Sequence, residues 1–182
     1  MAKRRKKKVA VVHCSGGSPL KAGIDRDGLA KDCAEILKAY PDGIADCAYG
    51  CLGGGSCVAA CKLKAVSLGE DHVARIDREK CVGCGLCVKA CPQHLIRLVV
   101  PENTIAPQCS NRDAGPAARK QCPNSCIACG ICVKNCPAGA MSIEDNHAVI
   151  NQNRCIACGM CAVKCPRGVI VDADGICTVA RA

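Results

Sequence analysis

The chain has 182 residues and a formal net charge of +9, with 21 cysteines, two tyrosines and no phenylalanine or tryptophan. It has no run of about 18 apolar residues and no secretory signal, so we expect a cytoplasmic protein without a membrane helix, whose thiols indicate a metal framework rather than disulfides. Six of the 25 basic residues lie in Lys3–Lys8, and the aromatic platforms of single-strand binders are missing, so the charge alone does not indicate nucleic-acid binding.

The first segments show a basic tail followed by a strand, a turn and a helix. Residues 1–8 are expected to form a disordered, solvated arm. Within the segment 9–46, Val9–Val12 predicts a buried strand, and helical periodicity extends from Asp27 to Tyr40. No phosphate-binding glycine motif accompanies this pattern, so we do not expect a nucleotide site.

Four cysteine runs follow, and three of them match C-x2-C-x2-C-x3-C-P, the bacterial ferredoxin spacing for [4Fe–4S] clusters. Three cysteines at intervals of three wrap around one cluster, and glycines between them let the backbone approach the sulfides. The fourth cysteine binds the cluster of the partner run. A zinc site needs two separated C-x2-C pairs, which is a poor match. These runs therefore predict iron–sulfur clusters.

The first run departs from this frame at its second position, where Gly54 stands in place of a cysteine. Cys47 lies four residues before the frame begins, as Cys122 does before the third run. We therefore expect Cys47 to supply the missing ligand. The alternatives are a three-iron cluster with one corner empty, or a fourth ligand from elsewhere in the chain.

The segments between the runs repeat, which indicates an internal duplication. Hairpins are predicted at 65–68 with 73–76 and at 140–143 with 148–150, and closing strands at 95–100 and 169–171. One-turn helices are predicted at 58–63, 88–90, 133–135 and 162–164. The predicted fold class is α+β, with two tandem ferredoxin-like units at 47–100 and 122–182 joined by a linker at 101–121.

Exchange of the fourth cysteine between paired runs assigns sixteen cysteines to four [4Fe–4S] clusters. The first set is Cys47, Cys51, Cys57 and Cys91, and the second is Cys61, Cys81, Cys84 and Cys87. The third set is Cys126, Cys129, Cys132 and Cys165, and the fourth is Cys136, Cys155, Cys158 and Cys161. Four oxidised clusters with their thiolates would add a charge of about −8, which offsets most of the basic excess.

Five cysteines fall outside these sets, namely Cys14, Cys33, Cys109, Cys122 and Cys177. A free cysteine is commonly a small core residue, which is the simpler interpretation. Cys14 and Cys109 both precede serine, and each is followed by a second cysteine, Cys33 or Cys122, ahead of a ferredoxin run. These four are therefore candidate ligands of a fifth cluster, whereas Cys177 is expected to bind no iron.

The sequence resembles the B subunit of the Rnf ferredoxin:NAD-type electron transport complex. The resemblance rests on the ferredoxin runs, on Y-G-C-L-G-G-G-S-C at Tyr49–Cys57 and on Q-C-S-N at Gln108–Asn111. The likeness covers residues 9 to 177. It implies a polyferredoxin that relays low-potential electrons between redox subunits, which are flavin or iron–sulfur proteins, within a larger oxidoreductase complex.

Two departures from that family limit what the resemblance implies. A membrane helix and a further cluster domain precede this region in the family and are not found in this sequence, and Lys62 stands where the family has proline. Ion pumping is therefore not expected to carry over, and any membrane association is expected to be peripheral.

The sequence shows no serine–histidine–aspartate or paired-carboxylate constellation, so we expect no catalytic site of its own. The alternative function is an iron–sulfur redox sensor that binds nucleic acid through Lys3–Lys8. No recognition module accompanies this tail, so nucleic acid is not the expected partner.

Overall fold

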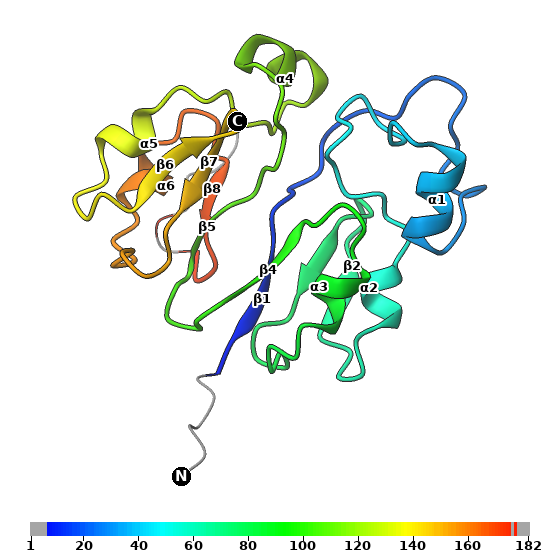
Figure 1. The fold of residues 1–182 in the computed structure, drawn as a ribbon, viewed down its shortest axis with the longest axis horizontal. Coiled ribbons are helices and arrows are strands. Elements are labelled where there is room, and N and C mark those ends of the chain that lie inside the picture. The colour runs from blue at the N-terminus through cyan, green and yellow to red at the C-terminus, as the bar shows by residue number, and fades with distance from the viewer. Residues whose placement is uncertain (1–6, 176, 178–182) are drawn as a thin grey trace.

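The computed structural model describes residues 7–175 and 177, and the order of its elements repeats once along the chain (Figure 1). The first half contains β1 (Val9–Val12), α1 (Cys33–Ala39), α2 (Ser56–Ala59), β2 (Val66–Leu68), β3 (Ala74–Ile76), α3 (Leu86–Ala90) and β4 (Ile96–Val99). The second half contains β5 (Ile105–Pro107), α4 (Gly115–Gln121), α5 (Ile131–Lys134), β6 (Met141–Glu144), β7 (His147–Ile150), α6 (Met160–Val163) and β8 (Ile170–Asp172). The two halves form neighbouring lobes.

Each half holds two small antiparallel sheets of two strands. The hairpins β2–β3 and β6–β7 lie where the alternating pattern predicts them. The first strand of each half pairs with its last, so that Val9 lies opposite Val99 in β1–β4 and Ile105 lies opposite Asp172 in β5–β8. This pairing closes each half on itself.

The strands β1 and β5 make the boundaries of the two halves differ from those expected. The sequence pattern assigns Val9–Val12 to a separate N-terminal segment, but in the structure it pairs with β4 and closes the first half. The segment 101–121, expected to be a linker, contains β5 and α4. Both strands pair with partners more than sixty residues away, and a local pattern does not reveal such pairing.

The helix expected from Asp27 to Tyr40 is shorter, because α1 begins only at Cys33. Asp32 sets this start, since its carboxylate accepts the backbone N–H groups of Ala34 at 2.8 Å and Glu35 at 3.1 Å. A side-chain acceptor at this position satisfies N–H groups that have no partner within the helix. The cap therefore fixes Cys33 as the first residue of α1.

Four helices of one turn follow the cysteine loops, as the sequence predicts, but each begins two residues earlier than expected. The glycine before each helix has φ between 71° and 81°. Glycine adopts this left-handed conformation without strain, so the chain turns sharply from the loop into the helix. The earlier start places the third cysteine of each run on a helix.

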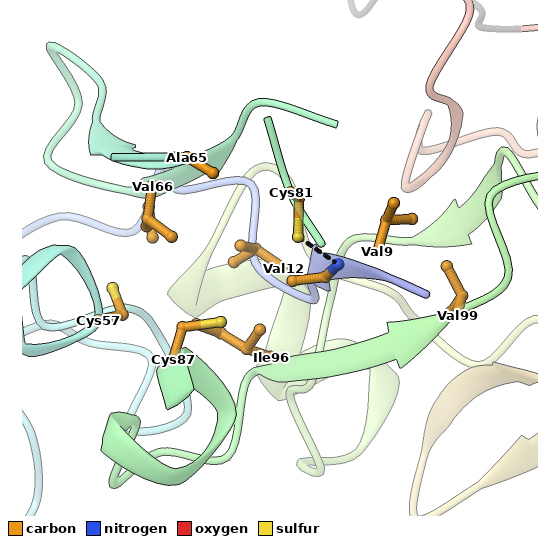
Figure 2. Packing of buried hydrophobic residues seen from close by; sticks show 11 residues of the cluster. Val9, Val12, Cys57, Ala65, Val66, Cys81, Cys87, Ile96 and Val99 are labelled. Atoms are coloured by element: carbon orange, nitrogen blue, oxygen red, sulfur yellow. Dashed lines mark hydrogen bonds between the residues drawn. The ribbon is translucent and has the colours of Figure 1, made fainter. Parts of the chain in front are cut away.

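The core is built from small aliphatic side chains and cysteines. In the first half, Val9, Val66 and Ile96 pack with Cys57 and Cys87 (Figure 2). The second half has an equivalent cluster around Ile105 and Ile170, and a third cluster surrounds Ile36, Ile44 and Leu52. Cysteine is thus part of each core. Within the range that the structure describes, no helix combines the length and the apolar character that a bilayer crossing requires.

Candidate iron–sulfur sites

The four cysteines predicted for the second cluster surround one apolar cavity. Cys61, Cys81, Cys84 and Cys87 line this space, which has a volume of about 240 Å³. The backbone N–H of Ala10 donates to the Cys81 sulfur at 3.3 Å (Figure 2), and that of Ala65 donates to the Cys61 sulfur at 3.3 Å. Amide hydrogen bonds to sulfur are a typical feature of iron–sulfur sites, where they tune the reduction potential.

The second half brings together thiols of separate runs in the pattern expected for exchanged ligands. Burial, together with the nearby thiols of Cys126, Cys165 and Cys129, raises the pKa of Cys132 to about 11. The Cys165 thiol comes from the following run, as an exchange of the fourth cysteine would require.

In the fourth set, burial and the neighbouring thiols of Cys155, Cys132 and Cys136 together raise the pKa of Cys161 to about 12. Because Cys132 belongs to the third set, the two sets lie next to each other. Thiols with a raised pKa are protonated at neutral pH, whereas metal binding needs thiolates. Iron binding therefore releases protons from both sets.

The cavity beside the first run is lined by a different thiol from the one expected. Cys33, Cys51, Cys57 and Cys91 line one narrow cavity, and Cys47 does not contact it. Burial, together with charge repulsion from the thiols of Cys51, Cys33 and Cys91, raises the pKa of Cys57 to about 12. Cys51 and Cys57 belong to the first run and Cys91 to the second. The remaining thiol is that of Cys33, at the start of α1.

Gly54 shows why a helix can supply this thiol. A Cβ atom at Gly54 would lie 3.0 Å from the backbone nitrogen of Cys33 and 2.8 Å from Cδ1 of Ile36. The position that lacks a cysteine is thus filled by the beginning of α1. The hydroxyl of Ser56 accepts the Cys33 N–H at 2.7 Å and donates to the Asp32 carboxylate at 3.0 Å, which joins the run to the helix.

Substitution of Gly54 by alanine is expected to destabilise the protein by roughly 1–3 kcal/mol, because the new methyl group overpacks the contact with α1. Gly28 is a matched control, since a Cβ atom there would meet only the Asp25 carbonyl at 3.8 Å. Thermal unfolding of the iron-loaded variants checks this expectation. Equal midpoints for Gly54→Ala and Gly28→Ala would contradict the tight packing of α1 on the first run.

Four further cysteines lie together where the two halves meet. Cys14, Cys47, Cys109 and Cys122 line a shared cavity with a volume of about 90 Å³, and Cys51 of the first run also lines it. The sequence pattern leaves Cys14, Cys109 and Cys122 as spare thiols and makes Cys47 a ligand of the first run. The structure instead groups Cys47 with these three.

Cys177 lies outside all five groups. Its side chain packs against the loop of the fourth run, where a Cβ atom at Gly159 would collide with the Cys177 sulfur. Its backbone N–H donates to the Asp172 carboxylate at 3.2 Å. The expectation that Cys177 binds no iron therefore stays a prediction, and Cys177→Ser is expected to leave the iron content unchanged.

The second cysteine of each regular run is exposed. These residues are Cys84, Cys129 and Cys158. Large apolar side chains stand beside two of them at the surface, with Val82 56% exposed and Ile156 66% exposed. Among the described residues, no group of three or more Cys, His, Asp or Glu side chains lies close enough to hold a single metal ion. A [4Fe–4S] cluster has a wider cage, because its four thiolates bind four different irons.

Comparison with known families defines the class of the protein. Residues 125–170 match the 4Fe-4S dicluster domain, and residues 74–97 match the 4Fe-4S binding domain. The chain is therefore an iron–sulfur protein with ferredoxin-type 4Fe–4S domains, and the prediction of [4Fe–4S] clusters is confirmed.

Similar proteins narrow this class. The chain is 42% identical over 145 residues to the B subunit of the Na(+)-translocating ferredoxin:NAD(+) oxidoreductase complex of Acetobacterium woodii, a match that covers 80% of this chain and 43% of that protein. It is 38% identical over 150 residues to the B subunit of the proton-translocating complex of Clostridium ljungdahlii (80% and 51%). It is 35% identical over 147 residues to the B subunit of the ion-translocating oxidoreductase complex of Methanosarcina acetivorans (80% and 55%).

These matches confirm the resemblance to the B subunit family that the cysteine patterns indicate. The chain spans about half the length of the relatives it matches. Neither the domain matches nor these relatives support the alternative of a redox sensor that binds nucleic acid.

Proposed function

We propose that this protein relays low-potential electrons between redox subunits of an oxidoreductase complex, through [4Fe–4S] clusters arranged in two dicluster units. The observation that supports this function most strongly is that thiols from different runs gather in shared cavities of the first half. Chained one-electron carriers of this kind let electrons pass between proteins without a diffusing ligand. The similarity to the B subunits of ferredoxin:NAD(+) oxidoreductases adds independent support.

The first two proposed ligand sets follow thiols that line shared cavities, and the other two combine the spacing of the runs with neighbouring thiols in the second half. The first set is Cys33, Cys51, Cys57 and Cys91, with Cys33 in the place that the sequence pattern assigns to Cys47. The second is Cys61, Cys81, Cys84 and Cys87. The third is Cys126, Cys129, Cys132 and Cys165, and the fourth is Cys136, Cys155, Cys158 and Cys161.

The proposed partners are a flavin or iron–sulfur protein as donor and a second one as acceptor, on the cytoplasmic side of the membrane. The exposure of Cys84 and Cys158, in opposite halves of the chain, supports this arrangement. A cluster held by an exposed cysteine lies near the surface, where a partner can approach it. The many thiols of the chain are also stable in a reducing compartment.

Electron exchange with a small ferredoxin tests the function. The iron-loaded protein is mixed anaerobically with a reduced ferredoxin, and the loss of its visible absorbance is followed in a stopped-flow instrument. We expect rapid bleaching, and recovery of the absorbance when an oxidised viologen is added. Protein that contains iron and sulfide but exchanges no electrons with either reagent would contradict the proposal.

Replacement of Cys84 by alanine is expected to remove one cluster, or about four irons per chain. The cysteine is exposed, so its loss removes a ligand without opening a hole in the apolar core. Iron analysis beside Cys177→Ser, as a control outside the sets, checks the result. An unchanged iron content in Cys84→Ala would show that this residue is not a ligand.

A further inference from the structure

We infer that Cys14, Cys47, Cys109 and Cys122 hold a fifth [4Fe–4S] cluster in the cavity between the two halves of the chain. This inference deepens the proposed function and rests on it, because it adds a carrier to the same relay. It concerns the four thiols that remain when the ferredoxin-type sets and Cys177 are set aside.

The positions of the four cysteines follow the internal duplication. Cys14 stands two residues after β1, and Cys109 stands two residues after β5. Cys47 and Cys122 each stand four residues before the first cysteine of a run. Each half therefore contributes the same two positions to one cavity. Core cysteines that merely fill space have no reason to meet in such equivalent pairs.

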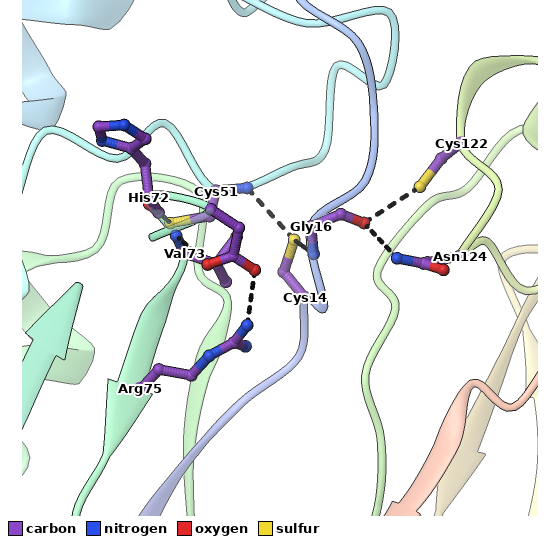
Figure 3. Close-up of polar contacts among 9 residues, drawn as sticks. Cys14, Gly16, Cys51, His72, Val73, Arg75, Cys122 and Asn124 are labelled. Atoms are coloured by element: carbon purple, nitrogen blue, oxygen red, sulfur yellow. Dashed lines mark hydrogen bonds and ion pairs between the residues drawn. The ribbon is translucent and has the colours of Figure 1, made fainter. Parts of the chain in front are cut away.

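The hydrogen bonds around Cys14 and Cys109 are equivalent as well. The Cys14 sulfur accepts the N–H groups of Gly16 and Cys51, each at 3.5 Å (Figure 3). The Cys109 sulfur accepts the N–H groups of Asn111 at 3.5 Å and Cys126 at 3.3 Å. Backbone N–H groups that donate to sulfur in this way are characteristic of iron–sulfur ligands.

The other two thiols are held toward the same cavity. The Asn111 side-chain amide donates to the Cys47 sulfur at 3.4 Å. The Cys122 sulfur lies 3.4 Å from the Gly16 carbonyl, so that Gly16 stands between Cys14 and Cys122 in Figure 3.

Polar contacts join the two halves beside the cavity. The Ser18 hydroxyl donates to the Gln121 carbonyl at 2.8 Å and accepts the Cys47 N–H at 2.9 Å. The Tyr49 hydroxyl donates to the Asp113 carboxylate at 3.3 Å. These bonds join residues next to Cys47 and Cys122 across the interface, so the thiols are held in place by both halves.

Two buried hydroxyl groups indicate that the cavity takes a polar guest. Ser15 is 8% exposed and Ser125 is 1% exposed, and both line this cavity. Neither side-chain oxygen has a hydrogen-bond partner in the described part of the chain. A buried hydroxyl without a partner costs free energy. The sulfides of a bound cluster are acceptors that both hydroxyl groups can use.

The size of the cavity favours a cluster over a single ion. The cavity has a volume of about 90 Å³, and among the described residues no three Cys, His, Asp or Glu side chains lie close enough to hold a single metal ion. Four thiolates on one zinc ion would have to meet at a single centre, with Zn–S distances of about 2.3 Å. Here they surround a space instead, which matches the separate corners of a cubane.

The location assigns a role to this cluster. The backbone of Cys51, a proposed ligand of the first set, donates to Cys14, and the backbone of Cys126, a ligand of the third set, donates to Cys109. The site therefore touches one ligand-bearing loop in each half. A one-electron carrier here would lie between the cluster pair of the first half and that of the second.

Iron counting with alanine variants tests the inference, since alanine, unlike serine, offers no oxygen ligand. The unaltered chain should contain about 20 irons, and Cys14→Ala and Cys109→Ala should each contain about 16. The double variant Cys14→Ala/Cys47→Ala should also keep about 16, because both residues serve one site. Cys177→Ser should match the unaltered chain.

Native mass spectrometry of the unaltered chain identifies the occupant and is decisive even if the variants do not accumulate. Five [4Fe–4S] units per chain would support the inference. Four units with an unchanged count in Cys14→Ala would overturn it, and so would four units with one zinc ion. In both of these outcomes the ferredoxin-type clusters remain, so the proposed function stands. A chain without iron or sulfide would instead contradict the proposed function itself.

Discussion

Removal of iron and sulfide is expected to unfold the protein. Chelation under denaturing and reducing conditions, followed by return to native buffer, should give a chain with poorly dispersed NMR signals and little protection of its amides. The described strands are three or four residues long, and four of the helices have four or five residues. Elements this short have little stability of their own.

The composition of the core explains this dependence on clusters. The buried residues are mostly valine, isoleucine, alanine and cysteine, and the chain has no phenylalanine or tryptophan. In the absence of metal, the thiols around each cavity face space that no side chain fills. Metal binding therefore contributes directly to the free energy of folding. A well-dispersed spectrum of the metal-free chain would contradict this account.

Replacement of Cys33 by alanine should remove the first cluster, and with it about four irons. The double variant Cys33→Ala/Cys47→Ala should lose about eight, because the two residues serve different sites. In the alternative predicted from spacing, Cys47 belongs to the first set and Cys33 is a core residue. Cys33→Ala would then lose no iron, and the double variant would lose about four.

Thermal unfolding is a second test of whether Cys33 or Cys47 binds the first cluster. Cys33 connects α1 to the loop that contains Gly54, and the small cluster of Ile36, Ile44 and Leu52 packs around this helix. Loss of the first cluster should therefore lower the unfolding midpoint of the N-terminal region. A midpoint for Cys33→Ala equal to that of Cys177→Ser would show that Cys33 holds no cluster.

The regular runs were predictable because their ligands are close together in the sequence. Spacings of three residues between Cys81, Cys84 and Cys87 determine how a loop can wrap around one cluster, and the glycine before each helix marks the end of that loop. The hairpins follow from short alternating patterns. These features need no knowledge of distant parts of the chain.

The thiol that takes the place of the cysteine missing at Gly54 was not predictable from spacing. Cys33 lies 21 residues before Gly54, on a helix whose start depends on the cap at Asp32. The only sign in the sequence that Cys33 faces the first run is its position on the apolar face of the expected helix. An ordinary core residue would occupy the same position, so this sign does not identify a ligand. The pairing of β1 with β4 and of β5 with β8 was not predictable for the same reason. Both depend on contacts that form only when each half closes.

Anaerobic analysis of iron and acid-labile sulfide in the purified chain tests the central claim most directly, which is that cysteines from separate segments meet in groups of four around iron–sulfide clusters. About 20 irons and an equal amount of sulfide per chain are expected, 16 of each from the four ferredoxin-type sites and four from the site between the halves. Fewer than about 12 irons without labile sulfide, or a colourless protein with stoichiometric zinc, would contradict it.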